Sequence, residues 1–332
     1  MFLYSTGLLC TTDMEMVKEI GLHKSLSLGK PSYLTKDRGP LLGQGILSSS
    51  GPIWSHQRKI IAPEFFPDKV KVSNYSKGEE IFSKLNALQM AMAKTYIGIP
   101  GMRYLPGKNN REIWKLEKEI DSLILSVVNH RTEEATHGKN LLQMILDGAE
   151  TYDDYKGLSK ERLASSCCAE VLETCKDGFL PDANALRNMK TLTMVILETL
   201  RLYPPATFVI RLALEDIDFK GIMIPKDMNI QIPIPALQQS LQLWGPDAHR
   251  FNPERFANGI VEACKVPQAY MPFGIGARIC TGQHFAMAEL KVALSLLLSK
   301  FCFSLSPACV HSPAFRLVIQ PEHRVRLLIK RA

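Results

Sequence analysis

The chain has 332 residues, 46% of them hydrophobic and 22% charged, which excludes disorder throughout and is typical of a globular protein with a sizeable core. The formal net charge of +7 favours acidic partners or an anionic membrane surface, but the basic residues follow no zinc-finger, basic-zipper or RNA-binding pattern, so we expect no nucleic-acid partner. The eight cysteines show no paired spacing, which argues against a disulfide scaffold in a chain of this length.

The first part of the chain, residues 1–68, is predicted to be a block of short strands and helices. Hydrophobic periodicity and the positions of Gly and Pro predict a strand pair over 2–12 that turns at Gly7 and a brief helix over 14–20. A Gly/Ser-rich loop over 39–51 and a longer helix over 52–61 that starts at a proline follow. No run in the chain approaches the roughly 18–20 apolar residues of a spanning helix, so we expect no membrane anchor in it.

The middle of the chain, residues 69–180, is predicted to be an abbreviated and patchy helical region. Periodicity predicts a strong helix over 110–130 and a further one over 140–148, followed by a polar stretch over 150–160. This region offers little chemistry.

The last part, residues 181–332, combines helices with β-rich sequence. The first predicted element is a helix over 182–203, capped by Asp182 and stopped by Pro204. Two β-rich runs with hairpin turns, a long apolar helix and a terminal hairpin are predicted over 207–214 and 218–233, over 283–301 and over 317–330, respectively. The sequence therefore predicts a mainly α fold with a smaller β portion, in a single domain over 1–332.

One loop carries the clearest chemistry. A glycine-rich segment from Phe273 to Gly282 places Cys280 just before the helix that starts near residue 283, where free amides and the helix dipole stabilise a thiolate, the form that binds metal. Phe273 can shield the sulfur, and Arg278 offers a cation for an acidic edge group. For such a loop alone, an inert structural turn is an equally good interpretation.

The full pattern, F-x-x-G-x-R-x-C-x-G, resembles the haem-binding loop of the cytochromes P450 at every fixed position. The resemblance implies the cytochrome P450 fold, haem b as cofactor and Cys280 as the axial metal ligand. It also implies that Phe273, Arg278 and Gly282 belong to the cofactor-binding loop.

Two further motifs follow the family's order along the chain. Glu198 and Arg201 form E-x-x-R on one helix face, and Arg255 lies in Phe-Asn-Pro-Glu-Arg-Phe. Taken alone, such a pair is usually solvated and contributes only about 0.2–0.5 kcal/mol. The resemblance implies instead a buried structural brace of all three side chains beside the haem.

Three upstream residues match positions at which the family contacts the haem propionates. Trp54 and Arg58 fit W-x-x-x-R, and Arg211 lies in the strand after the prolines. A Trp/Arg pair four residues apart is otherwise a common packing arrangement. The stretches 190–205 and 268–306 look most similar to the plant clan that oxidises gibberellins and other terpenoids.

The chain also departs from the family pattern. The A/G-G-x-D/E-T-T motif of the central helix, whose acid and alcohol deliver protons during oxygen activation, is missing, and the string over 147–152 is interpreted as a chance likeness. The separation of Arg58 and Glu198 is much shorter than the family's. The resemblance therefore implies an incomplete fold that lacks the central helix and its neighbours, with no catalytic acid or alcohol identified. Ala277 and Asp227 replace a usual proline and glycine.

The resemblance implies a haem-thiolate monooxygenase that inserts one oxygen atom from O2 into a hydrophobic small molecule, with electrons from NADPH through a cytochrome reductase. It also implies the cytosolic face of the endoplasmic reticulum membrane. Two alternatives stay open: a haem-thiolate enzyme that rearranges hydroperoxides and needs no acid/alcohol pair, and a catalytically inactive remnant.

Overall fold

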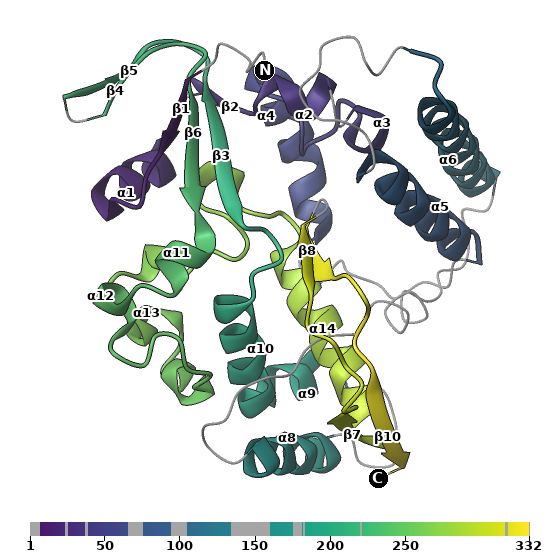
Figure 1. Cartoon of the computed structure of the whole chain (residues 1–332), viewed down its shortest axis with the longest axis vertical. Helices are drawn as coiled ribbons and strands as arrows, with labels where there is room; N and C mark the ends of the chain where they lie inside the picture. The colour runs from purple at the N-terminus through teal and green to yellow at the C-terminus, as the bar shows by residue number, and fades with distance from the viewer. Residues whose placement is uncertain are drawn as a thin grey trace. The chain divides into compact units, whose positions relative to one another are not determined.

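The computed structural model describes residues 7–23, 26–36, 39–65, 76–93, 105–133, 160–174, 181, 183–219, 221–315 and 318–331. The chain divides into two compact units built from interleaved stretches. The first unit comprises residues 1–11, 23–144 and 210–231, and the second comprises residues 12–22, 145–209 and 232–332. Helices dominate the element order over short strands, so the predicted mainly α architecture is confirmed (Figure 1).

The first unit contains a small sheet and a helix pair. Its elements are β1 (Leu8–Cys10), β2 (Leu28–Gly29), α2 (Ser32–Lys36), α3 (Gly39–Leu42), α4 (Gly51–Ile61), a 3-10 turn (Ala62–Phe65), α5 (Ser76–Ala93), α6 (Lys108–Glu133), β3 (Phe208–Ala213), β4 (Ile217–Phe219), β5 (Ile222–Ile224) and β6 (Asn229–Pro233).

The sheet has the strand order β1-β6-β3-β2. β1 runs parallel to β6 with Leu9 opposite Ile230, and β2 runs antiparallel to β3. The described part of the strand pair predicted near Gly7 is therefore one strand, whose partner lies far along the chain. The predicted hairpin turn at Gly221 is confirmed, because β4 and β5 pair antiparallel around this glycine, whose φ of 88° is left-handed.

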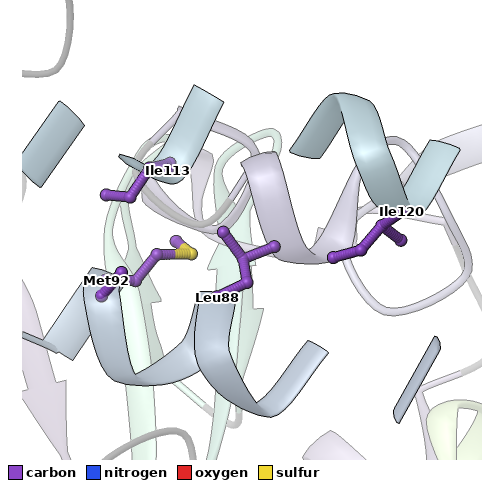
Figure 2. Close-up of a cluster of buried hydrophobic side chains, with 5 residues drawn as sticks. Leu88, Met92, Ile113 and Ile120 are labelled. Atoms are coloured by element: carbon purple, nitrogen blue, oxygen red, sulfur yellow. The ribbon is translucent and has the colours of Figure 1, made fainter. Parts of the chain in front are cut away.

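A hydrophobic core joins α5 to α6. Figure 2 shows Leu88 and Met92 of α5 facing Ile113 and Ile120 of α6, and each of these side chains is at most 5% exposed. The predicted strong helix is α6, which is longer at both ends than expected. α5 lies in the middle region, which the sequence predicts to be patchily helical.

The second unit contains most of the helices. Its elements are α1 (Met14–Leu22), α8 (Lys160–Thr174), α9 (Ala183–Asn188), α10 (Lys190–Leu202), α11 (Ile234–Gln238), α12 (Leu241–Trp244), α13 (Ile260–Ala263), α14 (Gln283–Leu298), three 3-10 turns (Pro253–Phe256, Pro267–Ala269, Gly276–Arg278), and the strands β7 (Phe301–Leu305), β8 (Pro313–Phe315), β9 (Ile319–Pro321) and β10 (Leu327–Arg331).

The helix predicted over 182–203 is two helices. The backbone leaves helical geometry at Met189, with φ −71° and ψ 79°, and α10 starts at the next residue. The Glu170 carboxylate of α8 accepts the N–H groups of Thr191 and Leu192, each at 2.9 Å, so it satisfies the free amides of the new helix end. Asp182, the predicted cap, lies outside the described residues.

The prediction of a terminal hairpin over 317–330 is wrong. β9 pairs antiparallel with β8, and β10 pairs antiparallel with β7. Alternation identified the strands but not their partners, because register depends on neighbours distant in sequence. The helix predicted over 140–148 and the string over 147–152 lie outside the described residues. Within the described part of the chain, no helix combines the length and apolar character needed to cross a membrane.

Candidate functional site

The loop from Phe273 to Gly282 is held in shape by hydrogen bonds between backbone groups. The N–H of Gly274 donates to the carbonyl of Met271 at 2.9 Å, and the N–H of Cys280 donates to the carbonyl of Phe273 at 2.8 Å. Gly274 and Gly276 have φ values of 83° and 70°, in the left-handed region that favours glycine. The loop thus returns on itself and leaves the Cys280 thiol exposed and outside any disulfide.

Helix α1 packs directly on this loop. A Cβ atom added at Gly276 would lie 2.2 Å from the carbonyl oxygen of Gly21 in α1, which is far inside van der Waals contact. Both groups are backbone, so a side chain at residue 276 could not be accommodated by a rotamer change. Gly276 is therefore required for the contact as well as for the turn.

The start of α14 follows Cys280 directly. Gly282 is the N-cap residue, and no side chain caps this helix end. The positive end of the helix dipole is therefore three residues from Cys280 in sequence, where it would favour negative charge on the thiol.

This donor set fits a haem iron. The porphyrin itself supplies most of the ligands of such an iron, so a single protein thiolate, that of Cys280, would be enough to hold it. Cys280 provides an accessible thiol for this purpose, and glycines on its N-terminal side leave no bulky side chain over the turn. Phe273 and Arg278, on either side of the turn, are both half-buried.

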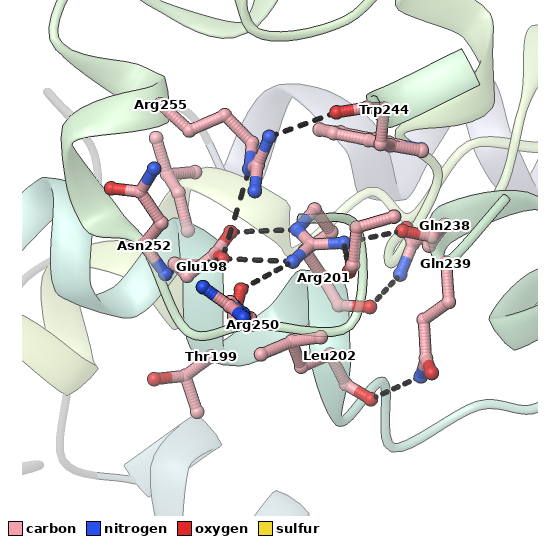
Figure 3. A network of polar contacts seen from close by, with 12 residues as sticks. Glu198, Thr199, Arg201, Leu202, Gln238, Gln239, Trp244, Arg250, Asn252 and Arg255 are labelled. Atoms are coloured by element: carbon pink, nitrogen blue, oxygen red, sulfur yellow. Dashed lines mark hydrogen bonds and ion pairs between the residues drawn. The ribbon is translucent and has the colours of Figure 1, made fainter. Parts of the chain in front are cut away.

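Glu198 and Arg201 form a fully buried ion pair at the C-terminal end of α10 (Figure 3). Arg201 donates from Nε and Nη2 to the two carboxylate oxygens at 2.7 and 2.8 Å, which is a bidentate geometry. The remaining donors of Arg201 bind three backbone carbonyls, those of Gln238, Ala248 and Arg250. Glu198 also accepts the N–H of Asn252 at 2.8 Å. The pair is therefore almost completely satisfied by hydrogen bonds.

Arg255 completes the group that the sequence predicted. Its Nε lies 3.8 Å from Glu198 Oε1, too far for a hydrogen bond but within ion-pair range. Its other nitrogens bind the Trp244 carbonyl at 3.0 Å and the Asp247 carboxylate at 2.8 Å. Partial burial raises the pKa of Asp247, but the hydrogen bonds from Arg255 and Asn252 outweigh it and hold this pKa below its usual range. The structure thus brings Glu198, Arg201 and Arg255 together.

Gln238 was not singled out from the sequence. Its side chain is fully buried and hydrogen-bonds to the end of α10 and to the segment that enters the thiolate loop. Glutamine has no motif of its own, and the signal that the sequence offered was a polar residue directly after the apolar run over 232–237.

The three predicted propionate ligands lie in the first unit. In α4, the guanidinium carbon of Arg58 lies 5.8 Å from the centroid of the Trp54 ring, which is a cation–π contact, and Trp54 is buried. Arg211 in β3 is buried and donates to the carbonyl of Ile210 at 3.0 Å. The structure brings Trp54 and Arg58 together and describes Arg211 on a separate element of the same unit.

Comparison with known proteins identifies a family. The cytochrome P450 family model matches residues 158–328. Cytochrome P450 714C2 of Oryza sativa subsp. japonica is 42% identical over 417 residues, covering 99% of this chain and 80% of that relative. Cytochrome P450 714A2 of Arabidopsis thaliana is 36% identical, covering 98% of this chain and 80% of the relative. The first alignment is longer than the 332 residues of this chain, so it includes positions at which this chain has no residue.

Proposed function

Because this chain belongs to the cytochrome P450 family, a class of oxidoreductase monooxygenases, we propose that Cys280 is the axial thiolate ligand of a haem b iron. The observation that carries the proposal is the geometry of one loop. The backbone N–H of Cys280 is bonded to the Phe273 carbonyl, while its thiol is exposed at the start of α14. A fixed backbone with an accessible sulfur is what a metal ligand requires.

Each remaining loop residue has a role that its chemistry supports. Phe273, seven residues before Cys280, would shield the sulfur on one side when haem is bound. Arg278 supplies a cation for a haem propionate. The same role for Trp54, Arg58 and Arg211 is a prediction from the sequence. Gly282 keeps the N-cap position of α14 free of a side chain near the thiolate. When bound, haem activates dioxygen with electrons that originate in NADPH and arrive through a reductase.

Glu198, Arg201 and Arg255 act as a structural brace. Their side chains are buried, and they lie in the same unit as the loop but 18 or more residues from it in sequence. We therefore assign them no contact with substrate. Their role is to fix the end of α10 and the segment around Asn252, through charged hydrogen bonds that the low-dielectric interior strengthens.

We further propose that the substrate is a hydrophobic small molecule of the gibberellin or terpenoid class, and that the reaction inserts one oxygen atom from O2 into it. The support is a resemblance seen in the sequence alone, over the stretches 190–205 and 268–306, together with the match to cytochrome P450 relatives from plants. The cytosolic face of the endoplasmic reticulum membrane, where an NADPH-dependent reductase would supply electrons, is the location that this reading implies.

A second candidate function follows from the missing acid/alcohol motif. A haem-thiolate enzyme that rearranges a lipid hydroperoxide needs no proton delivery to O2, because the substrate brings its own peroxide. An inactive haem-binding chain is the remaining outcome. Turnover with NADPH, reductase and a terpenoid supports the monooxygenase, and turnover with a hydroperoxide alone supports the rearrangement.

The thiolate assignment is tested by the carbon monoxide difference spectrum of the reduced, haem-loaded protein. Wild type is expected to give the thiolate-type band and Cys280→Ala to lose it completely. Cys302→Ala removes another exposed, free thiol of the same unit, and this control should keep the band. A thiolate-type band retained in Cys280→Ala would show that a different group ligates the iron.

A further inference from the structure

Gln238 is a fully buried side chain with a complete set of backbone partners. Its Nε2 donates to the carbonyls of Arg201 and Leu200 at 2.8 and 3.1 Å, and its Oε1 accepts the N–H of Met271 at 2.9 Å. The partners fix the orientation of the amide, since carbonyls can only face its NH2 group and an N–H can only face its oxygen. Gln238 therefore links the end of α10 to residue 271.

The link continues through the backbone to the thiol-bearing residue. The carbonyl of Met271 accepts the N–H of Gly274 at 2.9 Å, and the carbonyl of Phe273, inside that turn, accepts the N–H of Cys280 at 2.8 Å. Gln238 thus holds the first residue of the turn that orients the amide of Cys280. The backbone carbonyl of Gln238 also accepts a 2.7 Å hydrogen bond from Arg201, so the brace fixes Gln238 itself.

We propose that Gln238 is a positioning residue for the Cys280 thiolate, an inference that rests on the haem-thiolate function proposed above. The Gln238 amide sets the position of the Met271–Gly274 turn, and this turn sets the direction in which Cys280 presents its sulfur. Without the amide, the Met271 N–H is a buried donor with no acceptor from residue 238, and the turn moves to regain one.

The neighbouring Gln239 provides a matched control. It donates from Nε2 to the carbonyl of Leu202 at 2.9 Å, so it also binds the end of α10. It is only partly buried, however, and its side-chain oxygen lies beside His249 rather than Met271. Leucine at either position has a similar size and no hydrogen-bonding group. A second control, Glu170→Ala, weakens the opposite end of α10 by removing the acceptor for Thr191 and Leu192.

The experiment compares Gln238→Leu, Gln239→Leu, Glu170→Ala and wild type after loading with haem and reduction. The readout is the ratio of the thiolate-type to the neutral-thiol-type carbon monoxide complex per bound haem. We expect this ratio to fall about tenfold in Gln238→Leu, the effect of about 1.4 kcal/mol on an equilibrium constant, which is within the range for an unsatisfied buried donor. Both controls should keep the wild-type ratio, even where they lower the melting temperature.

Hydrogen–deuterium exchange of the loop amides provides a second readout that does not need haem. Faster exchange at Gly274 and Cys280 in Gln238→Leu, but not in Gln239→Leu, supports the positioning role even if wild type gives no thiolate band. A missing wild-type band would by itself reject only the haem-thiolate function. An unchanged ratio and unchanged exchange in folded Gln238→Leu would overturn the positioning role. Equal changes in Glu170→Ala would also overturn it, since they would show a general effect of stability.

Discussion

Replacing Glu198 by alanine is expected to lower the free energy of unfolding by about 3–5 kcal/mol. The substitution removes the one carboxylate that pairs with Arg201, whose side chain is completely buried and cannot turn to water. Arginine stays charged at all accessible pH values, so the positive charge remains in the interior without its counter-ion.

The magnitude follows from the hydrogen bonds at this carboxylate. Glu198 accepts two hydrogen bonds from Arg201, at 2.7 and 2.8 Å, and one from the Asn252 N–H at 2.8 Å. Hydrogen bonds to charged groups contribute about 1.5–3 kcal/mol each, so a simple sum over the three bonds, about 4.5–9 kcal/mol, reaches well above the expected loss. The loss is smaller because Arg201 keeps three backbone carbonyl acceptors.

Urea unfolding followed by circular dichroism measures this loss, provided that the slope with urea matches wild type. Lys115→Ala is the control, because this lysine is 78% exposed in its ion pair with Glu119 and its removal should change the free energy by less than about 0.5 kcal/mol. A loss below about 1 kcal/mol in Glu198→Ala would refute the reasoning, since it would mean that the interior solvates Arg201 without a counter-ion.

Three other predictions follow from single residues. Gly276→Ala should lower the free energy of unfolding by well over the roughly 1 kcal/mol expected for Gly259→Ala, because Gly259 has a similar left-handed φ but open space where a Cβ would lie. Equal losses in urea titrations would contradict the contact of Gly276 with α1. In timed alkylation read by mass spectrometry, the exposed Cys280 should react long before Cys167, because burial raises the pKa of the Cys167 thiol to about 11. Bound haem should protect only Cys280, and unchanged labelling of Cys280 with haem would argue against ligation. Asp227→Gly should relieve a φ of 67° and so raise the free energy of unfolding by up to about 1 kcal/mol, seen as a higher melting temperature. A lower melting temperature would show that the aspartate side chain stabilises the turn.

The ion-pair cluster could be foreseen because its members lie in short motifs with fixed spacing. Glu198 and Arg201 are three residues apart on one helix, so helical geometry alone places them side by side. Arg255 was connected to them only by the family's motif order, since no local rule brings residues from different elements together. Their backbone partners, such as Ala248 and Arg250, could not be foreseen, because any residue type supplies a carbonyl.

The loop from Phe273 to Gly282 could be predicted from the sequence, but the contacts that hold it in place could not. Cysteine, arginine and glycine at fixed positions identify the segment, and the left-handed angles at Gly274 and Gly276 agree with the expected tight turn. The hydrogen bond from Gln238 and the packing of Gly21 depend on tertiary contacts between distant segments. The predicted pairing of the C-terminal strands was wrong for the same reason, because periodicity indicates which face of a strand is buried but not which strand lies beside it.

The tryptophans of this chain are distributed between its two units. Of the three, Trp54 and Trp114 belong to the first unit and Trp244 to the second. Trp244 is buried, donates from its indole N–H to the Leu237 carbonyl at 3.0 Å, and has the Arg201 guanidinium carbon 5.0 Å from its ring centroid. Its fluorescence therefore reports directly on the surroundings of the brace. With the other two indoles replaced by phenylalanine, emission from Trp244 would follow the opening of the second unit alone.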